Sequence, residues 1–218
     1  MNKKFELLLD DTITIFGIKL FRIKALISFG NVEEGELGGY IEKEANLSFY
    51  GNAWVSGNAE VYGNAEVYGN ARVSGNAEVY GDARVSGNAE VYGNAEVYGN
   101  ARVSGNAEVY GDARVSGNAE VYGNAEVYGN AWVSGNAEVY GDARVSGNAD
   151  YIVFKNHWSS GRYFTYTKSN KMWRVGCFYG TGQELIKKAY QDSEVSGKHY
   201  EAYVEFVDKL EKLEEAND

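Results

Sequence analysis

Apolar and polar positions alternate with a period of six between residues 51 and 146. Each of the sixteen hexads reads Gly-Asn/Asp-Ala-X-Val-Tyr/Ser, where X is Glu, Arg or Trp, and the Gly, Ala and Val never vary. In an extended segment the Ala and Val of one hexad point to one side, and X and Tyr or Ser point to the other. The Gly-Asn or Gly-Asp step tolerates left-handed backbone angles. The period therefore predicts a strand of about four residues and then a corner in every hexad.

Three such hexads close a triangular coil, and successive coils stack about 4.8 Å apart as parallel strands. Val and Ala fill this prism, and the X, Tyr and Ser side chains face water. Sixteen hexads give slightly more than five coils. The chain contains no proline, as expected where every strand needs its N–H groups for the ladder.

The segments that flank the hexads are expected to cap the two ends of the prism, because a solenoid needs capping units. Residues 45–50 form a degraded hexad that places Leu47 and Phe49 in the inward Ala and Val positions. At the other end, Tyr151 would occupy a valine position, where the repeat stops. We expect three domains, namely an N-terminal β cap (1–50), the β-helix (51–150) and a C-terminal α+β module (151–218). The cap should contain antiparallel strands at residues 5–9, 12–16 and 19–27.

The C-terminal module combines a strand pattern with a helix pattern. Residues 151–155, 162–167 and 172–178 are predicted strands. Thr181 and Glu184 form a capping box that opens a helix through about residue 191. A second helix is predicted from about residue 198, with an apolar stripe for a core or a partner: Tyr200, Tyr203, Phe206, Val207, Leu210 and Leu213.

The repeat resembles the bacterial hexapeptide-repeat family, whose fold is a left-handed parallel β-helix. The family's aliphatic position matches Val55, Val61 and Val67, and its small inward position matches Ala53 and Ala59. Residues 20–26, 37–48 and 176–181 also resemble hypothetical transferases of this family from bacteria and prophages. The resemblance implies a mainly β fold, an origin in a phage or prophage, and a transferase label that rests on the fold alone.

Composition narrows the classes of function. One cysteine excludes a disulfide framework or a Cys-based zinc site within one chain. No apolar run is long enough to span a membrane, and we expect a cytoplasmic protein without a cofactor. The formal charge of −10 makes nucleic acid an improbable ligand for the whole molecule.

Catalysis is not expected. The acyltransferases of the resembling family carry a catalytic histidine and inserted loops on the coils, and the hexads here contain neither. A three-histidine zinc site is impossible, because the chain has only His157 and His199, far apart in sequence. Cys177 has no activating neighbour in sequence and is expected in a strand.

Stacking at intervals of 18 residues aligns acidic side chains on two faces of the prism. Arg114 and Trp132 interrupt one face and Arg72 and Arg144 the other, so neither is a uniform array. A ladder of Tyr62, Tyr80 and Tyr98 should offset part of the repulsion between like charges. The acidic candidates are Glu60, Glu78 and Glu96 on one face and Glu90, Glu108 and Glu126 on the other.

Basic and aromatic residues interleave between residues 151 and 183, where no acidic residue occurs. This pattern suits a surface that binds phosphates, bases or an acidic protein. It equally suits an ordinary sheet with aromatic residues inward and basic residues outward. The candidate binding residues are Lys155, Trp158, Arg162, Tyr166, Lys168, Lys171, Trp173 and Arg174.

Three classes of function remain open. The favoured hypothesis is a non-catalytic interaction protein, in which a rigid acidic β-helix displays a C-terminal binding module. In this hypothesis a phage-encoded protein acts on a host bacterial protein, and inhibition by imitation of DNA is one form of it. The alternatives are a structural protein that self-associates into a homo-oligomer and an acyltransferase-like hexapeptide enzyme.

Overall fold

The computed structural model describes residues 3–216. Residues 1–2 of the expected N-terminal cap and residues 217–218 of the expected C-terminal module lie outside the described part. Its contacts divide the chain into two compact units, residues 1–150 and 151–218. The first unit is a parallel β-solenoid preceded by a β-rich segment, residues 3–50, which we call the leader. The second unit is an antiparallel sheet with two helices. The expected fold class, mainly β with three hexads per coil, is confirmed.

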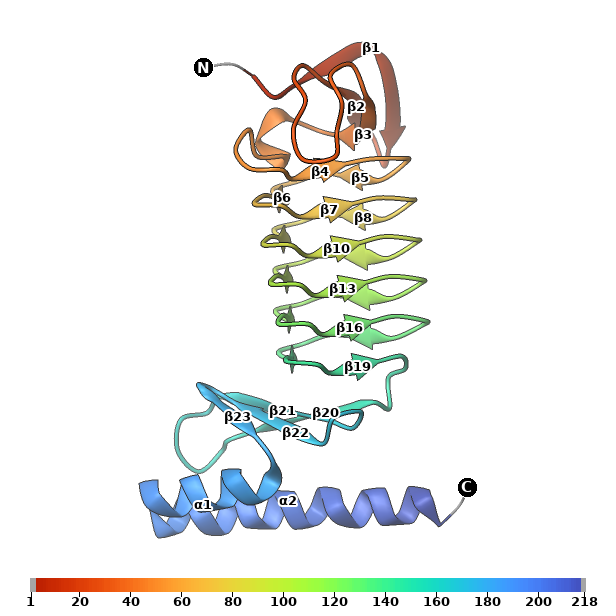
Figure 1. The fold of residues 1–218 in the computed structure, drawn as a ribbon. Coiled ribbons are helices and arrows are strands. Elements are labelled where there is room, and N and C mark those ends of the chain that lie inside the picture. Colours follow the sequence, from red (N-terminus) through yellow and green to blue (C-terminus); the bar gives the residue numbers. More distant parts are fainter. Residues whose placement is uncertain (1–2, 217–218) are drawn as a thin grey trace. The chain divides into compact units, whose positions relative to one another are not determined.

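Each hexad contributes one strand, which pairs in parallel with the strand 18 residues further along, as Glu78 does with Glu96. Three sheets result, and Figure 1 shows the strands of one of them stacked along the solenoid. The first face contains β5 (Glu60–Val61), β8 (Glu78–Val79), β11 (Glu96–Val97), β14 (Arg114–Val115) and β17 (Trp132–Val133). The second face contains β4 (Trp54–Val55), β7 (Arg72–Val73), β10 (Glu90–Val91), β13 (Glu108–Val109), β16 (Glu126–Val127) and β19 (Arg144–Val145). The third face contains β6 (Glu66–Val67), β9 (Arg84–Val85), β12 (Arg102–Val103), β15 (Glu120–Val121) and β18 (Glu138–Val139).

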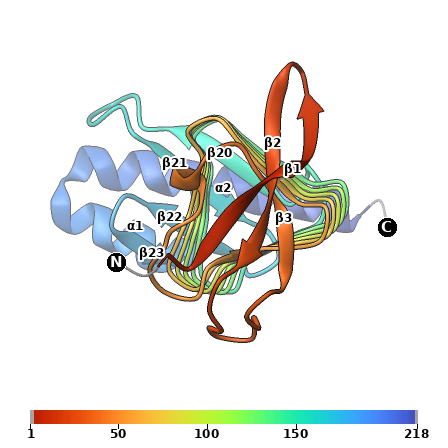
Figure 2. The ribbon, with the colours of Figure 1, turned by 90° about the horizontal axis from the view of Figure 1, so that it is seen from above.

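These strands are two residues long rather than the four that were expected. The difference arises at the alanine. The N–H of Ala77, for example, donates to the carbonyl oxygen of Ser74 at 3.3 Å and so belongs to the corner. The Ala and Val side chains of every hexad are nevertheless buried in the prism, and the coils overlie one another when seen from above (Figure 2).

The leader forms a hairpin that extends the first face of the solenoid. β1 (Phe5–Ile15) pairs antiparallel with β2 (Ile18–Ala25), and an irregularity between Leu8 and Thr12 joins two expected strands into one. β3 (Leu37–Ile41) pairs antiparallel with β2 and parallel with β5. Figure 2 shows the hairpin reaching beyond the outline of the coils.

The expected positions of Leu47 and Phe49 are wrong. After the short helix η1 (Glu44–Asn46), Leu47 bridges Val67 in parallel and therefore occupies a valine position. Phe49 instead stacks on Phe5, with ring centroids 4.6 Å apart. The reason is spacing, because Leu47 precedes the next valine position by eight residues rather than six.

The second unit is a meander of four antiparallel strands followed by two helices. The strands are β20 (Tyr151–Lys155), β21 (Tyr163–Thr167), β22 (Met172–Val175) and β23 (Phe178–Gly180), and the helices are α1 (Gly182–Asp192) and α2 (Glu194–Glu215).

Two predictions about the strands of this unit are wrong. Tyr151 pairs with Thr167 in the antiparallel sheet and does not continue the solenoid in a valine position. Cys177 lies exposed in a turn, not in a strand. Gly176 begins this turn with a φ of +57° and divides the expected strand 172–178 into β22 and β23.

The helices agree with the predicted capping but differ in extent. The capping box of Thr181 and Glu184 is present at the start of α1. The second helix begins at Glu194 rather than near residue 198, because Ser193 caps it by accepting the N–H of Ser196.

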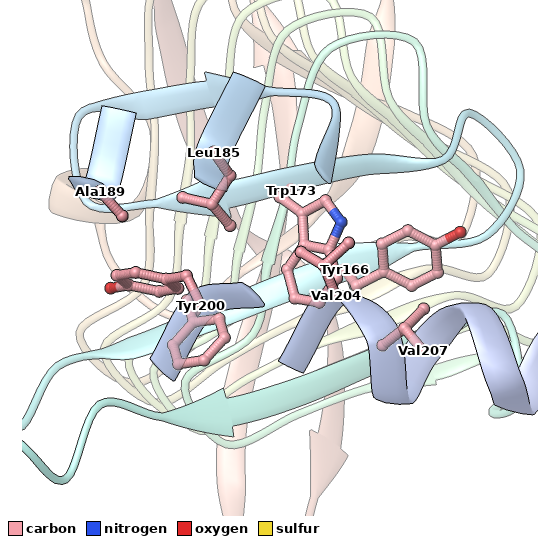
Figure 3. Packing of buried hydrophobic residues seen from close by; sticks show 8 residues of the cluster. Tyr166, Trp173, Leu185, Ala189, Tyr200, Val204 and Val207 are labelled. Atoms are coloured by element: carbon pink, nitrogen blue, oxygen red, sulfur yellow. The ribbon is translucent and has the colours of Figure 1, made fainter. Parts of the chain in front are cut away.

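The core of the second unit lies between the sheet and the helices (Figure 3). Only part of the predicted apolar stripe of α2 packs there, because Phe206 is 48% exposed and Leu213 is 62% exposed. Val204, which the predicted stripe omitted, is buried. The buried residues of this core are Phe164, Tyr166, Trp173, Leu185, Ala189, Tyr200, Val204 and Val207.

Candidate functional site

The glutamates of the solenoid lie in the expected register. Glu60, Glu78 and Glu96 are successive partners on the first face. Glu90, Glu108 and Glu126 are successive partners on the second face. Each trio is therefore a row of like charges one strand spacing apart, which by itself destabilises the sheet.

Tyrosine side chains offset this repulsion. Tyr62 and Tyr80 stack with ring centroids 5.0 Å apart, and Tyr80 and Tyr98 do the same. The hydroxyl of Tyr62 also donates to Glu78, at 3.2 Å. Equivalent bonds run from Tyr80 to Glu96, Tyr92 to Glu108, Tyr110 to Glu126 and Tyr122 to Glu138.

Burial and neighbouring charges raise the pKa values of residues on the first face. Burial, with the charge of Glu96 second, raises the pKa of Tyr80 to about 12. Burial and the charge of Glu78 raise the pKa of Glu60, whose Oε2 is buried without a hydrogen-bond partner. Burial likewise raises the pKa of Tyr62, so the hydroxyls of Tyr62 and Tyr80 remain donors to Glu78 and Glu96 at neutral pH.

Arginines also neutralise part of each acidic row. Arg114 lies 3.1 Å from Glu96, and Arg144 lies 3.0 Å from Glu126. The acidic faces are thus short rows bounded by ion pairs, not continuous acidic surfaces.

The basic and aromatic residues of the second unit divide into buried and exposed groups. Tyr166 and Trp173 are 3% and 2% exposed in the core, so their rings are not available to stack on a ligand. Trp158 is half-buried and stacks on His199 at 4.5 Å between centroids. This arrangement matches the alternative interpretation of the segment, with aromatic residues inward.

Acidic residues of α2 pair with two of the predicted lysines. Lys168 lies 2.7 Å from Glu214, and Lys171 lies 3.3 Å from Glu211. Of the other predicted basic residues, Arg174 is half-buried, and Lys155 is exposed over a tyrosine ring. Arg162 is exposed and has no ion pair among the described residues.

Arg162 lines a cavity of about 320 Å³ in the second unit. We call this cavity the module cavity. Its apolar lining comes from β21, the β22–β23 turn and α1, and includes Phe164, Phe178 and Leu185. Lys188 and Asp192 of α1 also line it and pair with each other at 3.6 Å. A cavity with an apolar lining and a few polar groups has the composition of a ligand site.

Two polar residues of the module cavity were not predicted from the sequence. The side-chain amide of Asn156 donates to the hydroxyl oxygen of Tyr200 at 3.2 Å. Because the Tyr200 oxygen accepts this bond, its own proton remains available to an acceptor in the cavity. Burial raises the pKa of Tyr200, so the hydroxyl stays protonated at neutral pH. No local pattern joins these residues, which lie 44 positions apart.

The fold also brings the two histidines together. The rings of His157 and His199 lie 5.7 Å apart, and the Nδ1 atom of His199 is 2.7 Å from the carbonyl oxygen of Val195. Among residues 3–216, no group of three or more His, Cys, Asp or Glu side chains is placed to hold a metal ion.

Comparison with protein families finds a similarity to the YdcK β-solenoid repeat at residues 65–81 and 95–111. Both matched segments lie in the coils and support a β-solenoid repeat protein. They cover a small part of the chain and include neither the leader nor the second unit. No curated protein matches the chain. Neither helix of the described chain is long and apolar enough to cross a membrane.

Proposed function

We propose that this β-solenoid repeat protein is a non-catalytic interaction protein, and that its second unit binds a partner protein through the module cavity. The observation that supports this proposal is the unpaired Arg162 beside an apolar cavity of about 320 Å³. Lys188, the other basic residue of the lining, pairs with Asp192, and the predicted Lys168 and Lys171 pair with acidic residues of α2.

The lining of the module cavity defines the chemistry of the partner. Phe164, Phe178 and Leu185 suit an apolar side chain, which the cavity is large enough to enclose. The guanidinium of Arg162 and the hydroxyl of Tyr200 can both donate hydrogen bonds to a carboxylate next to that side chain. The expected ligand is therefore a peptide segment in which a large apolar residue neighbours Asp or Glu.

The contrast with the solenoid supports a binding rather than a catalytic role. The outward tyrosines and glutamates of the coils bond to one another, as Tyr92 does to Glu108 at 2.9 Å. In the module cavity, Arg162 and Tyr200 are donors, and the carboxylate of Asp192 in the lining is paired with Lys188 at 3.6 Å. Donors beside apolar walls suit recognition of a carboxylate, whereas activation of a nucleophile needs a base that is free to accept its proton.

The test uses the full chain and a displayed library of random peptides. Selected peptides should pair a large apolar residue with Asp or Glu, and Arg162→Glu should weaken their binding at least tenfold. Lys187→Glu is the matched control, because this exposed lysine of α1 lies outside the cavity lining. Peptides without an acidic residue, or equal losses in both variants, would exclude the proposed site.

Two further measurements separate this function from the alternatives. Calorimetry with acyl-CoA and a nucleotide sugar should show no binding, and saturable binding of either would favour the acyltransferase-like enzyme. Sedimentation at low and high salt should show one species of constant mass. A salt-sensitive oligomer, with no peptide selected from the library, would favour the self-associating structural protein.

A further inference from the structure

A second recess lies on the solenoid, far from the module cavity in sequence. It has a volume of about 330 Å³ and lies where the first coils of the second face meet the leader. We call it the solenoid recess. Its lining is polar and consists of Asn31, Trp54, Ser56, Arg72, Ser74 and Glu90.

Arg72 differs from the other arginines of the repeat. All five repeat arginines lie in the described part of the chain, and four of them pair with a glutamate of an adjacent coil: Arg84 with Glu66, Arg102 with Glu120, Arg114 with Glu96 and Arg144 with Glu126. Arg72 is the direct ladder partner of Glu90, yet no ion pair within 4.0 Å joins them. It is also half-buried, whereas the other four are exposed. The recess therefore contains a guanidinium that forms no ion pair within residues 3–216.

The space in the recess comes from two serines. In the hexads, glutamate at X is always followed by tyrosine at the sixth position, and arginine or tryptophan is always followed by serine. Ser56 and Ser74 lie on successive coils of the second face, where tyrosines occupy the same position on the next three coils. Among the described residues, neither serine hydroxyl has a hydrogen-bond partner, and Glu90 receives no tyrosine hydroxyl.

Trp54 adds an independent observation. Its side chain is 3% exposed, and its indole Nε1 is buried with no hydrogen-bond partner. The corresponding nitrogen of Trp132 donates to Ser116 at 2.8 Å, so an indole of this repeat can be satisfied by the protein. A buried donor without a partner is rare in folded proteins, and a bound polar species is one of the features that accounts for it.

We propose that the solenoid recess binds a small zwitterion of the class of free α-amino acids. Arg72 would receive the carboxylate, with the serine hydroxyls as further donors, and Glu90 would receive the ammonium group. Adjacent strands of a sheet lie about 4.8 Å apart, so both charges lie within reach of one small molecule. A doubly charged anion such as phosphate is disfavoured, because Glu90 lines the same recess.

The experiment measures binding by calorimetry between the full chain and each standard free amino acid. Acetate and methylamine serve as probes that carry only one of the two charges. At least one amino acid should bind with one site per chain, and both single-charge probes should bind at least tenfold more weakly.

The decisive variant is R72E/S74Y, which converts residues 69–74 into the hexad Gly-Asn-Ala-Glu-Val-Tyr found elsewhere in the solenoid. The variant should fold, as circular dichroism will show, and should bind the amino acid at least tenfold more weakly. The control R102E/S104Y makes the same conversion on the third face, away from the recess, and should bind like the wild type. The proposal is overturned if no amino acid binds the wild type, if acetate binds as tightly, or if the control loses binding equally.

Discussion

Replacement of a corner glycine by alanine should show how much the stability of the solenoid depends on glycine at the corners. Gly93 has a φ of +75°, and an added Cβ atom would lie 3.0 Å from the backbone nitrogen of Gly111 and 3.1 Å from its oxygen. The clash is with backbone of the next coil, which the ladder holds in place. The glycine is therefore required both for its backbone angle and for the stacking distance.

The expected cost has two parts. A left-handed conformation costs a residue with a side chain about 1–2 kcal/mol. Overpacking against fixed backbone adds about 1–3 kcal/mol. Alanine also reduces the entropy of the unfolded chain, which returns about 0.4–1 kcal/mol. We expect Gly93→Ala to lower the free energy of unfolding by about 3 kcal/mol.

The chain offers matched controls for the two parts. Gly135 has a φ of +68° with nothing within 4 Å of an added Cβ, so Gly135→Ala should show the backbone strain alone, about 1 kcal/mol. Gly129 lies in the same coil as Gly135, and its added Cβ would lie 2.9 Å from the oxygen of Ser146. Gly129→Ala should therefore lose about as much stability as Gly93→Ala. This result would show that the smaller loss in Gly135→Ala does not arise from its position along the solenoid.

The assay is urea unfolding followed by circular dichroism, with hydrogen exchange to locate the destabilised coils. The predicted order of stability is Gly135→Ala above both Gly129→Ala and Gly93→Ala. Equal losses in all three variants would refute the reasoning, because backbone strain would then account for the whole effect.

Three further predictions concern pH and capping. Because the folded pKa of Tyr80 is raised to about 12, the folded chain holds this proton more tightly, and stability should fall as the pH rises from 10 to 12. Absorbance of tyrosinate should show this late titration coinciding with unfolding. The pKa of Glu60 is raised by burial and by Glu78, so stability should decrease as the pH rises through the ordinary carboxyl range. Glu60→Gln should therefore stabilise the chain at pH 7 but not in acid, as thermal melts at both pH values would show. Thr181→Ala should cost about 1 kcal/mol by removing the cap of α1, measured by urea unfolding.

The period of the sequence was sufficient to predict the solenoid and its register. A repeat of six residues with fixed Gly, Ala and Val permits only one arrangement of corners and inward positions. The pairing of Glu78 with Glu96 follows from three hexads per coil and needs no further information. The short strands were not predicted, because inward alternation does not show which backbone groups belong to the ladder.

The ends of the solenoid could not be derived in the same way. Leu47 occupies a valine position because it lies eight residues before Val55, two more than the period of the repeat. The degraded hexad alone was compatible with either assignment of its inward positions. Tyr151 had the spacing of a valine position, but its pairing with Thr167 forms a separate sheet. In both places the local pattern is compatible with two structures, and contacts distant in sequence select one.

The module cavity was only partly predictable for a related reason. The basic and aromatic pattern identified Arg162, yet it also included Tyr166 and Trp173, which are buried. Alternation in a strand separates two sides without indicating which one a helix will cover. Asn156 and Tyr200 meet through packing of α2 on the sheet, and such pairs carry no short-range signal.

The two kinds of hexad explain why the solenoid recess lies at the first coils of the second face. A Glu-Val-Tyr hexad satisfies itself by stacking, because a tyrosine hydroxyl of one coil reaches the glutamate of the next, as in Tyr110 and Glu126. An Arg-Val-Ser hexad depends on a glutamate above or below it, as Arg84 depends on Glu66. On the second face the first two coils carry tryptophan and arginine, so Arg72 lies between Trp54 and Glu90 and forms an ion pair with neither. The recess around Arg72 therefore follows from two successive hexads that end in serine, because Ser56 and Ser74 leave open the space that stacked tyrosines fill on the next three coils.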